Sequence, residues 1–316
     1  MKRIILIPLF LSFIFFRSAA FASAVLVDAK GAVEVKIGDK AVEPKVGLEL
    51  PDGSSIKTKK GAKAQVMFLD GTIRTLVANE SLIVGKLEKS GAQTTVIEGI
   101  QLALNEASQS GEGPTVHGMV KMGPPATGKP KIILGSSSFG IEGLYPIHTT
   151  ILMPKQDLVF MWSDTTKIDW TNPVLVVKNA EKKQMGIFSV PKGAKQLVVP
   201  LSQLKLKSGE TYSWHLGYKQ KGIMIVKGSH YPFTILGKKG EASLQKDIET
   251  IKTLEFSPKA ETLMLGQVYY KYGLYHHTTE ILVPLSQAGD VGGAVKQILF
   301  VSYLRMGLSS EMEKYR

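Results

Sequence analysis

The chain has 316 residues, enough for two or three domains of ordinary size. Hydrophobic residues make up 44% and charged residues 21%, a globular composition that excludes a disordered or membrane-embedded chain. The formal net charge is +12, and lysine supplies almost all of the positive charge. Because specific nucleic-acid recognition favours the bidentate fork of arginine, this balance argues against a nucleic-acid partner.

The start of the chain has the pattern of a secretory signal peptide. A basic start precedes an unbroken apolar run at residues 4–16, which is shorter than the roughly 20 residues of a membrane span. Small residues then match the A-x-A cleavage pattern, either at Ala20 and Ala22 or at Ala22 and Ala24. Arg17 departs from this pattern, so an uncleaved segment that holds the protein on a membrane is the alternative.

The sequence contains no cysteine, which excludes disulfides and a thiol nucleophile. An exported chain that folds without disulfides must bury substantial cores. Its basic surface suits an envelope rich in anionic polymers. We therefore expect a periplasmic or secreted protein of the bacterial cell envelope.

Residues 25–88 have the pattern of short strands joined by tight turns. Val33, Val35 and Ile37 alternate with charged residues, which predicts a half-buried strand. A second alternating run leads to Asp70 and Gly71, a favoured two-residue hairpin turn.

The same stretch resembles the FecR-type domain family. The G-x-V-x-V opening, the G-x-x-I-x-T step and the D-G-[ST] strand end of that family are matched at residues 31–35, 53–58 and 70–72. The resemblance implies an all-β domain. The best-known members carry surface signals to a sigma factor through an N-terminal anti-sigma segment and a membrane span. This sequence has a signal peptide in place of both, so we expect the fold without that role.

Residues 89–150 are rich in glycine, proline and serine, which predicts a β extension of the first domain or a linker. Two stretches here approach catalytic motifs. Residues 123–130 nearly match a phosphate-binding P-loop, but Pro130 replaces the serine or threonine that holds magnesium. Residues 135–140 miss the nucleophile elbow, because Phe139 replaces its second glycine. Neither stretch indicates a cofactor or a catalytic residue.

Residues 151–237 return to strands at the spacing of a β-sandwich. Leu206, Gly209 and Tyr212 match the L-x-x-G-x-x-Y corner of fibronectin III and immunoglobulin-like domains, which this stretch resembles. The resemblance implies that the tyrosine hydroxyl ties the start of a strand to the preceding loop. Trp162 and Trp214 are then expected in the core, between facing sheets.

Residues 241–316 have helical periodicity. An apolar stripe recurs at three- and four-residue spacing and consists of Leu244, Ile248, Ile251 and Leu254. Ser257 and Pro258 predict the N-cap and the first position of the next helix.

A period of 34 residues relates the two segments that end at Gly273 and Gly307. This period, with Leu265, Gly266 and Tyr269, resembles the tetratricopeptide repeat family. The first copy departs from that family at Thr278, where it prefers alanine, and at Pro284 inside the second helix. The resemblance implies paired helices that bind proteins.

Two groups near the helix turn are candidate site residues. His276 and His277 are adjacent, and consecutive helical positions point about 100° apart, so we expect polar corner residues and no metal site. The four tyrosines of the stripe either line a groove for a partner or pack helix against helix, the more common role. They are Tyr269, Tyr270, Tyr272 and Tyr275.

A third candidate is the densest run of lysines, which either contacts an anionic polymer or is a solvated turn. It consists of Lys57, Lys59, Lys60 and Lys63.

Together these patterns predict a multidomain protein of β plus α class, without a catalytic centre, cofactor or metal. The expected parts are a signal peptide (1–24), a FecR-like β-domain (25–88), an extension or linker (89–150), an immunoglobulin-like sandwich (151–237) and tetratricopeptide-like helices (241–316). The function that we expect is a non-enzymatic envelope scaffold or adaptor that binds another envelope protein. The alternative is a binding module for a cell-wall or surface polysaccharide, acting through the FecR-like domain.

Overall fold

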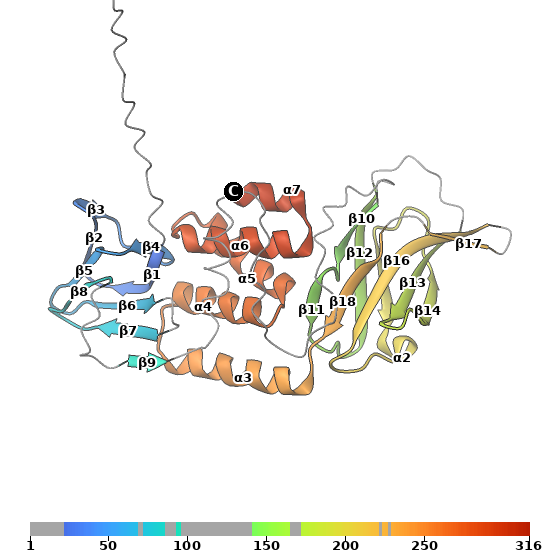
Figure 1. Ribbon diagram of the computed structural model, residues 1–316, viewed down its shortest axis with the longest axis horizontal. Coiled ribbons are helices and arrows are strands. Elements are labelled where there is room, and N and C mark those ends of the chain that lie inside the picture. Colours follow the sequence, from blue (N-terminus) through green and yellow to red (C-terminus); the bar gives the residue numbers. More distant parts are fainter. Residues whose placement is uncertain are drawn as a thin grey trace, which may run out of the picture.

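The structure is a computed structural model and describes residues 22–68, 72–85, 93–95, 141–164, 172–220, 223–226 and 229–316. Several sheets, almost entirely antiparallel, are followed by helices that are mostly C-terminal, which confirms the β plus α class. The helices that follow residue 237 lie in the middle of the molecule, with one β unit on each side (Figure 1).

The first β unit consists of two sheets. One has the strand order β4-β1-β6-β7-β9 and the other β3-β2-β5-β8. The bounds are β1 Ala22–Lys30, β2 Val33–Ile37, β3 Lys40–Val42, β4 Leu48–Pro51, β5 Ser55–Thr58, β6 Lys63–Phe68, β7 Thr72–Leu76, β8 Ser81–Ile83 and β9 Gln93–Thr95. The expected strand at Val33 is β2, and it alternates buried and exposed side chains as predicted.

Strand β1 is buried on both faces. Ala24 and Leu26 pack with the core between the two sheets, whereas Val25 and Val27 belong to the core that the helices complete. Ala24 is fully buried and pairs with Leu50 on β4 and with Phe68 on β6. Of the two expected cleavage positions, the one after Ala22 therefore keeps Ala24 in its strand.

The second β unit also consists of two sheets, ordered β10-β12-β15 and β11-β18-β16-β13-β14, with β17 paired to β16. The bounds are β10 Ile141–Tyr145, β11 Thr149–Ile151, β12 Asp157–Asp164, β13 Pro173–Asn179, β14 Gln184–Ser189, β15 Gln196–Pro200, β16 Thr211–Gln220, β17 Ile223–Val226 and β18 Tyr231–Ile235. The sheets pack face to face. The rings of Trp162 and Trp214, from opposite sheets, lie 6.4 Å apart in this core, as expected.

The tyrosine corner expected from the sequence is present. The Tyr212 hydroxyl accepts a hydrogen bond from the Lys207 backbone N–H at 2.8 Å and donates to the Glu210 carboxylate at 2.9 Å. These bonds tie the start of β16 to the loop before it. Two residues further along β16, the Trp214 indole N–H donates to the Pro146 carbonyl, between β10 and β11, at 2.6 Å.

The helices are α2 Leu201–Leu204, α3 Lys238–Thr253, α4 Pro258–Lys271, α5 Tyr275–Gln287, α6 Gly293–Met306 and α7 Ser309–Met312, followed by a 3-10 turn at Glu313–Tyr315. Ser257 caps α4 as predicted, and its hydroxyl accepts from the Ala260 N–H. Gly273 and Gly307 end corresponding helices, with φ angles of 71° and 75° that favour glycine. Within the described residues, no helix is both long and apolar enough to span a bilayer.

Candidate functional site

The tyrosine stripe contacts other parts of the molecule. Tyr270 is buried, and its ring lies 5.2 Å from that of Tyr275. The Tyr272 hydroxyl donates to Asp247 on α3 at 2.8 Å, and Lys271 forms an ion pair with the same carboxylate at 2.9 Å. Burial, followed by the bond to Asp247, raises the pKa of Tyr272. The bonds to Asp247 hold α3 against α4, and the contact of Tyr270 with Tyr275 joins α4 to α5. This is the packing role considered for the stripe.

His276 and His277 lie in the first turn of α5, where the helices meet the second β unit. The His276 ring stands edge-on to Tyr145 at 4.6 Å, and the His277 ring lies 5.5 Å from Tyr269. Burial, with a smaller contribution from His277, lowers the pKa of His276 to about 4, so the ring is neutral at pH 7. Among the described residues, no group of three or more side chains is arranged to bind a metal. The histidines are corner residues, more buried than their polarity suggests.

The helices are fastened to the first β unit at two junctions. At the first, Asp28 of β1 accepts hydrogen bonds from the Ser257 hydroxyl at 2.7 Å and from the Ser257 N–H at 2.9 Å. Asp28 is only 8% exposed, so its charge is compensated by these donors and by the N-terminus of α4.

The second junction brings two glycines into backbone contact. The Gly292 N–H donates to the Val46 carbonyl at 2.8 Å, and the Ala294 N–H donates to the Gly47 carbonyl at 3.2 Å. A Cβ atom on Gly292 would lie 2.2 Å from the Gly47 oxygen, so only glycine fits there. Beside this contact, Gln297 donates to Glu49 at 2.7 Å. Burial raises the pKa of Glu49.

A third junction joins the helices to the second β unit. The Gly273 carbonyl, in the turn between α4 and α5, accepts from the Thr150 N–H at 2.8 Å and from the Thr149 hydroxyl at 3.0 Å. The Tyr275 N–H donates in turn to the Thr149 hydroxyl at 3.2 Å. Apolar side chains of both β units and of the helices form one contiguous core. The helical region therefore connects the two β units through specific contacts on both sides.

The lysine run lies at the end of β5, in the following turn and at the start of β6. Lys57, Lys59 and Lys60 are exposed, whereas Lys63 is half-buried. Lys59 forms an ion pair with Glu34 at 2.6 Å, and both side chains are more than half exposed. An exposed pair of this kind contributes little to stability, so the run is a solvated basic surface.

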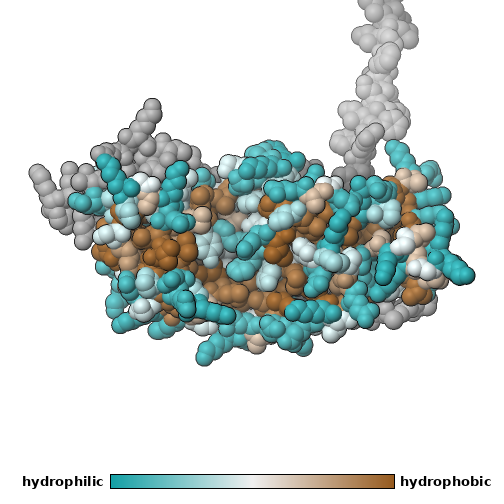
Figure 2. Space-filling model, turned by 180° about the vertical axis from the view of Figure 1, so that it is seen from behind, coloured by the Kyte–Doolittle hydropathy of each residue, from teal (hydrophilic) through white to brown (hydrophobic). Residues whose placement is uncertain are grey.

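Exposed apolar side chains occur on both β units. Met161 on β12 and Val198 on β15 are 39% and 49% exposed, on the face of their sheet opposite Trp162 and Val199, which are buried. Figure 2 shows hydrophobic side chains gathered at this end of the molecule, the left side of that view. On the first unit, Val77 is 54% exposed.

Several predicted features fall outside the described residues: the apolar run at 4–16, the turn at Asp70 and Gly71, and the motif-like stretches at 123–130 and 135–140. The junction residues Asp28, Glu49 and Gly292 were not identified from the sequence. They carry no local pattern, because their partners lie more than 200 residues away. In comparisons with known proteins, no protein-family model matches the chain, and no curated protein matches it either.

Proposed function

We propose that this chain is an exported, non-enzymatic scaffold or adaptor of the bacterial cell envelope, which binds another envelope protein. In this proposal its parts are a FecR-like domain, an immunoglobulin-like sandwich and a tetratricopeptide-like helical region. The observation that carries the proposal is the position of the helices. They join two β units into one body and leave the far end of each unit facing outward (Figure 1). A body of this shape can hold two partners, or a partner and a surface, at a fixed separation.

The arrangement moves the expected contact surface away from the tyrosines. Tyr270 and Tyr272 are used inside the molecule, where they pack α4 against its neighbours. The outer face at Met161 and Val198 offers apolar area without rearrangement of the core. Exposed apolar side chains that lie together on a polar surface are typical of protein contacts.

The test is in-cell crosslinking and pull-down of the full chain with single substitutions. Removal of residues 241–316 would expose Val25 and Val27, so lost binding after deletion would report unfolding. Val198→Lys instead places a charge on the proposed contact face, and Val77→Lys is its control, with a similar exposed fraction on the other unit. We expect an envelope protein to be recovered with the unchanged chain and with Val77→Lys, and lost with Val198→Lys. Failure of the unchanged chain to recover any envelope protein would overturn the proposal.

The second candidate function is binding of an anionic cell-wall or surface polysaccharide by the first β unit. It is favoured by the position of Lys57, Lys59 and Lys60, exposed together beside one turn. The test uses the full chain, because the first unit shares its core with the helices. Replacement of Lys57, Lys59, Lys60 and Lys63 by glutamine should weaken sedimentation with isolated wall at low salt. The control replaces four exposed lysines of α3: Lys238, Lys239, Lys246 and Lys252. Equal loss with both variants would count against a specific site.

A further inference from the structure

The second β unit carries most of the net positive charge of the protein. Residues 151–237 contain twelve lysines and five acidic residues, a formal charge of +7 out of +12 for the whole chain. The run at Lys57 to Lys63 is denser in sequence, but residues 25–88 as a whole are nearly neutral, with ten basic and nine acidic residues. The main basic surface is therefore on the sandwich.

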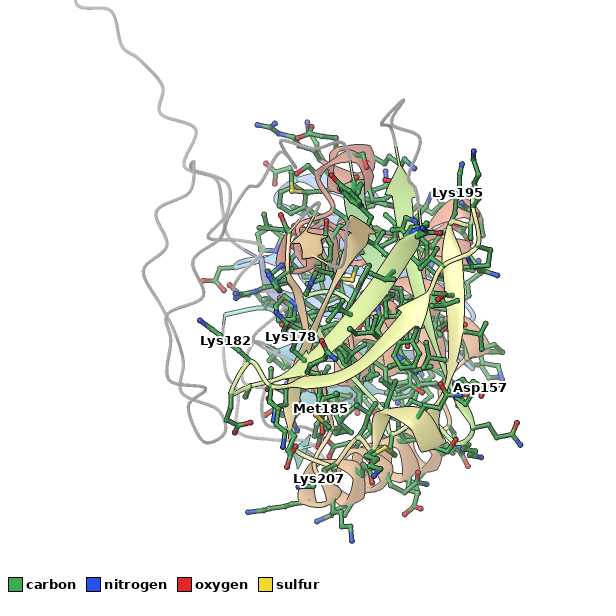
Figure 3. All side chains as sticks on the ribbon, turned by 90° about the vertical axis from the view of Figure 1, so that its right-hand side faces the viewer. Asp157, Lys178, Lys182, Met185, Lys195 and Lys207 are labelled. Carbon is green, nitrogen blue, oxygen red and sulfur yellow. The ribbon has the colours of Figure 1, made fainter. Side chains whose placement is uncertain are left out.

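Within this surface, strand pairing brings a buried histidine next to lysines. Trp214 and Leu216 on β16 face the core, so His215 between them points to the outer face of the sheet. His215 pairs with Val176 on β13, and Lys178 follows two residues later on the same face. Lys182 lies in the turn between β13 and β14, and Figure 3 shows both lysines at the same edge of the sheet.

His215 is 1% exposed, yet its Nδ1 atom has no hydrogen-bond partner among the residues that the structure describes. Its ring lies 4.3 Å from that of His230, which precedes β18 and is exposed. Buried polar atoms are nearly always paired, so this nitrogen is available to a water or to a ligand. The same is true of His276 and His277, but only His215 has an exposed histidine and lysines beside it. Buried His215 and exposed His230 thus form a pair of tilted rings that reaches from the interior to the surface.

The charged groups that act on this pair are cationic. Burial, with smaller contributions from His230 and Lys178, lowers the pKa of His215 to about 4. Burial also lowers the pKa of His230, with Lys178 and Lys182 as the charged neighbours. The one carboxylate of the β13–β14 turn, Glu181, acts on Tyr212 and on neither histidine. An anion bound here would compensate charges that the carboxylates of the described residues leave uncompensated.

We propose that His215, His230, Lys178 and Lys182 form a binding site for a phosphate group. The four side chains come from β13, the β13–β14 turn, β16 and the segment before β18. Donors on several sides suit a tetrahedral anion better than a flat carboxylate. Lysine recognises phosphate as a point charge, and histidine adds directed N–H donors. The site is separate from the partner surface at Val198 and from the lysine run of the first unit, so it adds to the proposed function and does not depend on it.

Phosphate binding at this site should be coupled to proton uptake. Both histidines are neutral at pH 7, because their pKa values lie below the ordinary value of 6.5. A bound anion favours the protonated ring, so phosphate binding should raise the pKa values of both histidines.

The test is a titration of the full chain with inorganic phosphate, followed through the histidine ring resonances by NMR at pH 6. We expect saturable shifts of the His215 and His230 signals and an increase in the pKa of His230 when phosphate is bound. Lys178→Gln should weaken binding about fivefold, the effect of one nearby charge in a wet site. The control, Lys183→Gln, removes an exposed charge of the same hairpin that acts on neither histidine, and should bind normally.

Two further ligands distinguish a phosphate group carried by a lipid from one carried by a soluble polymer. Vesicles of phosphatidylglycerol that shift the same signals would identify a lipid headgroup, and soluble polyphosphate that does so would identify a free polymer; both results support the site. Absence of saturable shifts, equal weakening by Lys178→Gln and Lys183→Gln, or equal binding of acetate would overturn the proposal.

Discussion

A methyl group at Gly292 should separate the helices from the first β unit. In Gly292→Ala the new Cβ atom would lie 2.2 Å from the Gly47 oxygen and 2.3 Å from the Leu48 nitrogen. Both are backbone atoms, so the contact cannot be relieved by rotation of a side chain. The start of α6 must move outward from β4.

The expected loss of stability follows from what this movement breaks. The hydrogen bonds from Gly292 to Val46 and from Ala294 to Gly47 are both lost or lengthened, at about 1 kcal/mol each. Overpacking of a close contact adds about 1 kcal/mol or more. The free energy of unfolding should therefore fall by about 3 kcal/mol, which corresponds to a Tm lower by roughly 5 °C in a chain of this size.

Thermal and urea unfolding measure this effect, with Gly237→Ala as the control. Gly237 is also a helix N-cap, with φ −73° and ψ 152° against −78° and 176° at Gly292. Its Cβ atom would meet its nearest neighbour at 3.7 Å, an ordinary contact. Both substitutions therefore share the change of cap residue, and only one creates a clash. Equal Tm values for the two variants would refute the reasoning.

Three further predictions concern polar groups. Asp28→Ala should lower the free energy of unfolding by about 2–3 kcal/mol in urea titrations, because it removes the charged acceptor for both bonds from Ser257; no change would refute the first junction. Tyr212→Phe should lower it by about 1–2 kcal/mol, since the Lys207 N–H loses its acceptor, and a loss below about 0.3 kcal/mol would show that water replaces the hydroxyl. The pKa of His276 is about 4 when folded and near 6.5 when unfolded, so the unfolded chain binds more protons between these values. Stability should accordingly be full above pH 6.5 and decline as the pH falls toward 4, and urea titrations of His276→Phe should show a shallower decline; an identical pH profile would contradict the assignment.

The features that could be predicted from the sequence are those set by neighbouring residues. Ser257 followed by Pro258 is a local helix start, and its capping bond forms as expected. Gly273 and Gly307 sit where the chain needs a positive φ, which their spacing already indicated. Tyr212 also bonds within five residues of its own position. In each case the signal and its partner lie in the same short segment.

The features that could not be predicted depend on contacts between distant segments. Strand β1 was not identified, because a strand buried on both faces has no alternation, and its apolar residues adjoin the signal-like run. The Gly47 contact with Gly292 has no pattern in either segment. The cationic cluster was missed for the same reason. Lys178 and His215 are 37 residues apart, and only the pairing of β13 with β16 brings them together.

The burial of β1 on both faces has a consequence for how the chain folds. Asp28 and Ser257 are separated by 229 residues, and Glu49 and Gln297 by 248. Loops of this length lose conformational entropy when they close, before the contacts between their ends can stabilise the fold. This loss slows folding. Until α4 and α6 arrive, the face with Val25 and Val27 stays open to other unfolded chains. The docking of α4 and α6 should therefore be the step that ends the exposure of this face during folding.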